Sequence, residues 1–184
     1  MHTVPRSDIV DYQTWSDQRE SRLEGILETK RTRRIHLGPH LTFLFENRDT
    51  IRWQVQEMMR VERIVRERDI QHELDTYNEL LGKPGDLGCT LLIEIDDPAD
   101  RDAKLTAWLD LPQHLYVELD DGTRVSAVYD DRQVGDRRLS SVQYLLFPVE
   151  GKTPVAIGCS LAAHSHHAVL TEAQHASLAQ DLGQ

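Results

Sequence analysis

Between Arg33 and Leu81 the chain carries two short strand patterns followed directly by two helix patterns, and this run decides the architecture. The strand patterns, Arg33 to Leu37 and Leu41 to Glu46, surround the turn pair Gly38-Pro39 and are rich in β-forming residues. No Gly or Pro interrupts the residues that follow, as far as Leu81. The run therefore predicts a β-hairpin followed by consecutive helices.

The first predicted helix of this run starts after Asn47 or Asp49, both good N-caps, and continues to about Glu67. Its apolar residues fall on two opposite sides when it is wound at about 100° per residue, so we expect other elements to cover both sides. The second predicted helix runs from about Ile70 to Leu81, with Asp69 as its N-cap.

Carboxylates lie within the apolar faces of both predicted helices. Glu62 falls inside the face of the first helix, and Glu73 lies at the edge of the face of the second. A buried carboxylate needs a cation, a hydrogen-bond donor, a proton or a metal. A further helix is predicted from about residue 8 to 29, and Arg19 and Arg22 share its apolar face. Because a guanidinium holds a carboxylate with two hydrogen bonds, these arginines are the expected partners.

The polar cluster has three interpretations, which the sequence leaves open. They are a structural network of arginines and glutamates, a binding or acid–base pocket, and a metal site. Helical di-metal sites use Glu-x-x-His on two helices, whereas this chain has only Asp69 with His72 at that spacing. The candidate ligand-binding residues are Arg19, Arg22, Glu57, Glu62, Glu73, Tyr77 and Asn78.

A second candidate group, His164, His166 and His167, precedes the last predicted helix. Imidazoles are good ligands for transition metals, so these three residues are candidate metal ligands. Adjacent residues of a strand point to opposite faces, so His166 and His167 bind together only if the segment bends. The alternatives are exposed loop histidines or one packed histidine.

The sequence identifies no catalytic residue and no cofactor, and leaves open whether the protein is an enzyme. It contains no Gly-x-Ser-x-Gly elbow, phosphate loop or dinucleotide fingerprint. Cys89 and Cys159 lie far apart, which fits a reducing cytoplasm. No apolar run approaches the ~18 residues of a membrane span. The net charge of −10 argues against nucleic acid as a partner. We therefore expect a cytoplasmic protein that binds neither membrane nor nucleic acid.

The rest of the chain predicts one α+β domain, with a helical part over about 1–82 and a sheet-based part over about 88–184, separated by the breaker at 82–86. Asp120-Asp121-Gly122 predicts a hairpin in a mainly antiparallel sheet. Packed helices are expected from Pro98 to about Leu109 and from Thr171, the predicted N-cap, to Leu182. The basic run from Lys30 to Arg34 is either a solvated helix end or an anion site.

Four segments resemble the family of bacterial proteins called domain of unknown function 3501. They read RIHLGPHLTFLFENRDTIRWQVQEMMRVERI, HELDTYNELL, TLLIEI and SSVQYLLF, and the similarity covers nearly the whole chain. Members tend to be encoded near rubrerythrin-like and iron–sulfur oxidoreductase proteins. The resemblance therefore implies a redox setting. Because the chain also lacks a complete catalytic constellation, we expect an accessory or interaction protein, with such proteins or a second copy of the chain as partner. The alternative is a small metal- or ligand-binding protein or an enzyme that uses a carboxylate and arginine pocket. The resemblance supplies no active site, so the candidate residues rest on this sequence alone.

Overall fold

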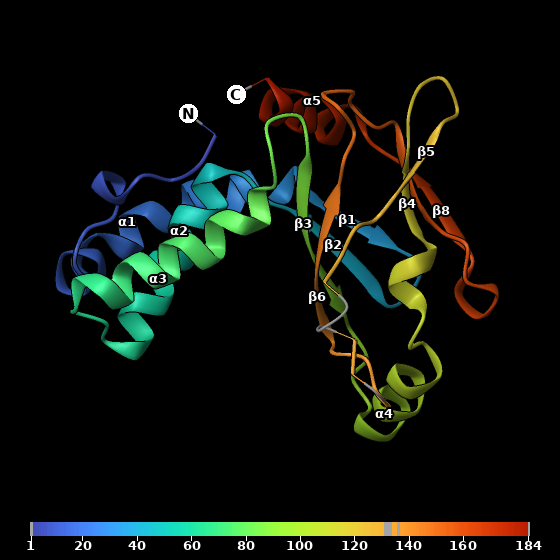
Figure 1. The fold of residues 1–184 in the computed structure, drawn as a ribbon, viewed down its shortest axis with the longest axis horizontal. Coiled ribbons are helices and arrows are strands. Elements are labelled where there is room, and N and C mark those ends of the chain that lie inside the picture. Colours follow the sequence, from blue (N-terminus) through green and yellow to red (C-terminus); the bar gives the residue numbers. More distant parts are fainter. Residues whose placement is uncertain (1, 131–133, 136, 184) are drawn as a thin grey trace.

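Two antiparallel sheets and a group of helices make up the structure, a computed structural model that describes residues 2–130, 134–135 and 137–183 (Figure 1). The helices are α1 (Tyr12–Arg31), α2 (Arg48–Glu62), α3 (Glu67–Asn78), α4 (Pro98–Ala107) and α5 (Glu172–Leu182). The strands are β1 (Arg34–Leu37), β2 (Leu41–Phe45), β3 (Leu87–Ile93), β4 (Leu115–Glu118), β5 (Arg124–Ser126), β6 (Val142–Phe147), β7 (Ala156–Cys159) and β8 (His166–Val169). The predicted α+β class is confirmed.

The strand order is β1-β2-β3-β6 in the first sheet and β5-β4-β7-β8 in the second. The main core lies between the sheets, where Phe43 and Phe147 of the first sheet are buried in one cluster with Val117 and Ile157 of the second. The residues after β5 leave the second sheet and pair with the edge of the first, because Val128 and Leu146 exchange both backbone hydrogen bonds at 2.7 and 2.8 Å. Backbone pairing therefore links the two sheets at one corner.

Helices α1, α2 and α3 gather on one side of the sheets, and α4 and α5 lie at opposite ends of them (Figure 1). The helical group has its own apolar clusters, one around Ile51, Val55 and Leu74 and another around Trp15 and Trp53. The predicted hairpin, β1 and β2, belongs to the first sheet although it lies between two helices of this group in sequence. The division into parts 1–82 and 88–184 stays a prediction.

The ends of α2 and α3 differ from the prediction. Asn47 is the N-cap of α2, and its side chain accepts hydrogen bonds from the amides of Asp49 and Thr50. The helix ends at Glu62, before the predicted Glu67, because Arg63 takes the left-handed conformation with φ 53°. The prediction of Asp69 as the N-cap of α3 was wrong, since that helix already begins at Glu67.

His166 and His167 begin the edge strand β8 rather than a loop, and His164 ends a short 3-10 helix just before it. Thr171 caps α5 as expected, in a capping box with Gln174. Within the described ranges, the helices are all too short or too polar to cross a lipid bilayer.

Candidate functional site

The carboxylate of Glu57 is the centre of a polar network between α1 and α2. Its oxygens accept hydrogen bonds from Trp15 Nε1 at 2.8 Å, Arg19 Nε at 3.0 Å and Arg60 Nε at 3.2 Å. Partial burial raises the pKa of Glu57, but the hydrogen bonds from Arg60, Trp15 and Arg19 outweigh it, so the net pKa is lowered. The chain's own donors therefore occupy the carboxylate oxygens of Glu57, as expected for a structural network.

The expectation that Arg19 and Arg22 pair with Glu62 and Glu73 was wrong. Arg19 pairs with Glu57, and Arg22 lies over the ring of Trp15 at 5.8 Å. Glu62 is exposed in the last turn of α2, because the helix ends immediately after it. The structure thus brings only part of the predicted cluster together at the α1–α2 contact.

Asn78 joins the N-terminal segment to the end of α3 by two hydrogen bonds. Its side-chain oxygen accepts a hydrogen bond from the amide of Val4 at 2.9 Å, and its amide group donates to the Val4 carbonyl at 3.0 Å. Backbone groups of the chain itself therefore occupy the polar atoms of this candidate residue.

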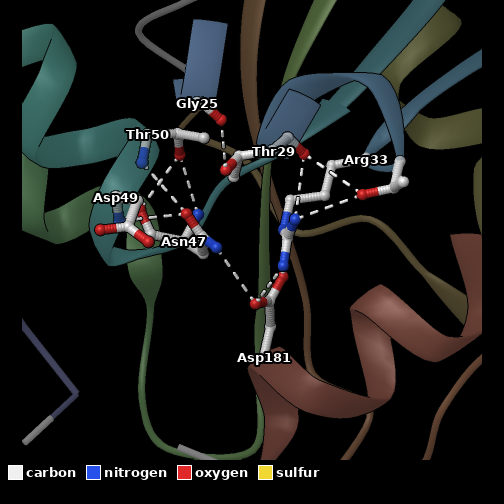
Figure 2. Close-up of polar contacts among 8 residues, drawn as sticks. Gly25, Thr29, Arg33, Asn47, Asp49, Thr50 and Asp181 are labelled. Atoms are coloured by element: carbon white, nitrogen blue, oxygen red, sulfur yellow. Dashed lines mark hydrogen bonds and ion pairs between the residues drawn. The ribbon is translucent and has the colours of Figure 1, made fainter. Parts of the chain in front are cut away.

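Arg33, the centre of the basic run, is buried and is held by a carboxylate. Its Nε and Nη2 donate to Asp181 at 2.6 and 2.8 Å, and its Nη1 donates to the carbonyl of Thr29 at 3.0 Å (Figure 2). Asn47 Nδ2 donates to the same carboxylate at 3.2 Å. Arg33 therefore joins α1, α2 and α5 and does not present its charge to an external anion.

Glu73 and Tyr77 line a different feature, a groove of about 530 Å³ between α3 and β6. Its volume lies within the range of about 300–1,000 Å³ that is usual for ligand pockets. Aliphatic residues of η2, the 3-10 helix Glu79–Leu81, of β6 and of the segment after β5 make its apolar part; they are Leu80, Val128, Leu145 and Leu146. We call this feature the α3–β6 groove.

Phenols and carboxylates form the polar part of the α3–β6 groove. Three tyrosines, Tyr77, Tyr129 and Tyr144, lie along it together with three acidic residues, Glu73, Glu79 and Asp130. Burial raises the pKa of Tyr144, and the neighbouring Tyr77 and Glu46 raise it further, so this phenol is neutral at physiological pH. Among the described lining residues there is no Lys, Arg or His. The groove therefore favours a positively charged group with an apolar body.

The candidate histidines do not share one element or one face. His164 ends the short 3-10 helix Ala162–His164, and His166 and His167 point to opposite faces of β8. The rings of His164 and His166 lie close, with centroids 4.5 Å apart, whereas His167 lies on the opposite face with Nε2 3.6 Å from Glu118. His40, at the β1–β2 turn, lies 6.2 Å from His164 between ring centroids. Sequence reasoning missed His40 because it lies far from the others along the chain. In the part of the chain that the structure describes, no three His, Cys, Asp or Glu side chains form a ready metal site.

Both cysteines are unsuited to nucleophilic chemistry. Burial raises the pKa of the Cys89 thiol well above its usual value, and burial also raises the pKa of Cys159. Each residue has about 1% of its surface exposed. Such thiols behave as small apolar groups.

The fold and the groove define an α+β protein with two packed antiparallel sheets, a group of helices and an acidic, aromatic groove between them. The family model of a protein of unknown function, DUF3501, matches residues 3–182, so the chain belongs to that family. It is similar to a crystal structure described as a novel protein of unknown function from Burkholderia pseudomallei, with 29% identity and a TM-score of 0.89. That match covers 97% of this chain and 98% of the other. No protein with a curated description matches the sequence.

Proposed function

We propose that this protein is a cytoplasmic accessory protein whose α3–β6 groove binds a cationic, partly apolar segment of a protein partner. The composition of the groove carries this proposal: carboxylates and phenols surround an apolar floor, and the described lining contains no basic side chain. A Lys or Arg side chain matches both parts, since its aliphatic stem packs on apolar groups and its charged end stays polar. The tyrosine faces attract the same cation.

The charge of the whole chain supports a basic partner. A net charge of −10 attracts positively charged surfaces over distances up to about the Debye length, which is about 8 Å at physiological salt. The attraction mainly raises the association rate, so binding through this groove weakens as salt is added. Val128 and Tyr144 supply exposed apolar surface at the same place, at 53% and 39% exposure. A short basic segment can therefore contact apolar surface in the groove and is attracted to the protein by its negative charge.

The class of partner in this proposal comes from the family resemblance, which implies a rubrerythrin-like protein or an iron–sulfur oxidoreductase. The alternative function is that of a small metal- or ligand-binding protein. In that case a free organic cation would bind in the α3–β6 groove. Self-association as a homodimer is a separate prediction, and light scattering on the purified chain measures it directly.

The first experiment compares two short peptides by titration calorimetry. One alternates lysine with leucine and phenylalanine, and the other has glutamate in place of each lysine. We expect only the lysine peptide to bind. The variant Glu73→Gln, combined with Glu79→Gln, should weaken that binding by about tenfold, since each partly exposed charge contributes up to about 1 kcal/mol.

The control is Glu62→Gln, which removes one carboxylate charge from an exposed helical residue outside the groove and is compared with Glu73→Gln alone. It should leave peptide affinity unchanged. Equal binding of the glutamate peptide, or an equal loss in the Glu62 variant, would show that general charge attraction and not the groove is responsible.

The second experiment tests the class of partner with purified proteins. A rubrerythrin-like protein and an iron–sulfur oxidoreductase are each passed over the immobilised chain, and retention by the wild type but not by the Glu73/Glu79 variant is expected. Binding of the peptide without retention of either protein would reject the redox partner while leaving the groove as a binding site. Binding of hexyltrimethylammonium but not of the peptide would favour the small-molecule alternative.

A further inference from the structure

Three imidazoles from distant parts of the chain meet where the β1–β2 turn lies against β8. The ring centroids of His164 and His166 are 4.5 Å apart, and those of His40 and His164 are 6.2 Å apart. The indole of Trp108 lies 5.0 Å from His164 and 5.9 Å from His40, and so forms an apolar wall beside two of the three rings. This cluster is independent of the α3–β6 groove.

His164 is the buried member of the cluster, and one of its polar atoms lacks a partner. The residue is 3% exposed, and its Nε2 finds no hydrogen-bond partner among the described residues. An unsatisfied buried polar atom costs about 1–3 kcal/mol, so such an atom calls for an explanation. A bound ligand that accepts the lone pair of His164 Nε2 would explain why this atom has no hydrogen-bond partner.

The separations of two of the three ring pairs are close to those expected for shared coordination of a metal. Zinc lies about 2.0–2.1 Å from an imidazole nitrogen in a tetrahedral arrangement, which places the centroids of two coordinating rings about 5 Å apart. The two observed separations, 4.5 and 6.2 Å, lie on either side of that value. His166 is exposed and His40 is half-buried, so both rings are more accessible than that of His164.

The β1–β2 turn is shaped to hold the exposed ring. Gly38 has φ +62°, and a Cβ at this position would lie 2.5 Å from Cδ2 of His166. The absence of a side chain at Gly38 therefore serves the turn and also lets the ring of His166 lie against it. His36, the other histidine of this hairpin, contacts Thr42 instead, with 2.9 Å between its Nδ1 and the hydroxyl oxygen of Thr42.

We propose that His164, His166 and His40 bind one divalent transition-metal ion, with zinc as the preferred class. Neutral imidazoles suit this ion, and a wall such as Trp108 limits access of water to it. Among the described residues no three His, Cys, Asp or Glu side chains are arranged to hold a metal ion, so this proposal requires the rings of His166 and His40 to turn toward His164 when the ion binds. Water completes the tetrahedron.

The test uses the full chain without an affinity tag, stripped with a chelator and titrated with Co²⁺, whose visible absorption reports coordination. One equivalent should bind with the bands of a nitrogen-ligated site. His166→Ala and His40→Ala should each weaken binding at least about tenfold, as loss of a metal-supporting residue typically does. Because His164 is buried, its own substitution would disturb packing, so the two more accessible residues carry the test.

The matched control is His167→Ala, one residue along the same strand but on its opposite face. It should bind Co²⁺ and Zn²⁺ as the wild type does, with an unchanged thermal midpoint. Binding far below one equivalent, wild-type affinity in His166→Ala, or an equal loss in His167→Ala would overturn the proposal and indicate adventitious binding to surface histidines. Peptide binding at the α3–β6 groove is measured separately, so failure of one proposal leaves the other intact.

Discussion

The guanidinium of Arg33 and the carboxylate of Asp181 form two parallel hydrogen bonds, at 2.6 and 2.8 Å, although they lie near opposite ends of the chain (Figure 2). Their side chains are only 7% and 6% exposed. Asn47, the N-cap of α2, also donates to Asp181. One buried carboxylate therefore fixes the last helix to the start of β1 and to the helical group.

Asp181→Ala should destabilise the protein by about 3–5 kcal/mol, because it leaves the buried charge of Arg33 without its partner. Urea denaturation followed by circular dichroism measures the loss. The control is Glu28→Gln, which breaks the exposed pair with Arg31 and should leave the denaturation midpoint unchanged. Equal midpoints for Asp181→Ala and the wild type would mean that the pair contributes no net stability.

Glu57 should make stability depend on pH. Its pKa is lowered in the folded protein, so the stabilisation is fully present above the unfolded pKa, which is about 4.3, and is lost as pH falls through the folded value. Glu57→Gln should therefore be less stable than the wild type at pH 7, and the gap should narrow by pH 3. Denaturation curves at several pH values give the difference, and a constant gap would contradict a folded-state pKa shift at this residue.

Gly88→Ala should cost about 3 kcal/mol or more, because the new Cβ would meet the backbone carbonyl of Leu80, which cannot move aside as a side chain would. The control is Gly25→Ala, in the interior of α1 with open space around it. That substitution should stabilise by about 0.5–1 kcal/mol. Thermal unfolding of both variants checks the contrast, and a tolerated Ala at position 88 would contradict the tight contact of η2 with β3.

Cys89 and Cys159 should resist thiol reagents in the native protein, since both are buried and burial raises both pKa values. Ellman's reagent should release two equivalents only after denaturant is added. Fast labelling of either thiol in the native protein would instead indicate local opening of the sheet that contains it.

Local sequence signals predicted most of the elements correctly. Thr171 was predicted as an N-cap and serves as one, and Asn47 was one of the two N-caps predicted for α2. The Asp-Asp-Gly turn lies between β4 and β5, as predicted. These features depend on residues within a few positions of each other, so the sequence alone is sufficient to predict them. The end of α2 at Arg63 was missed, because a non-glycine residue in the left-handed conformation has no strong local signal. Strand β8 was missed because its pairing with β7 supplies its structure.

The sequence by itself determined the fold class, the helices and turns, and which residue types carry the polar chemistry. Only the tertiary structure decided which of them meet. It placed Arg19 on Glu57, Arg33 on Asp181, and Glu73 and Tyr77 in the groove with β6. It also brought His40 to His164 and turned His167 away. The physical reason is that secondary structure follows local conformational preference, whereas these partners lie far apart along the chain and meet only when the sheets and helices pack together.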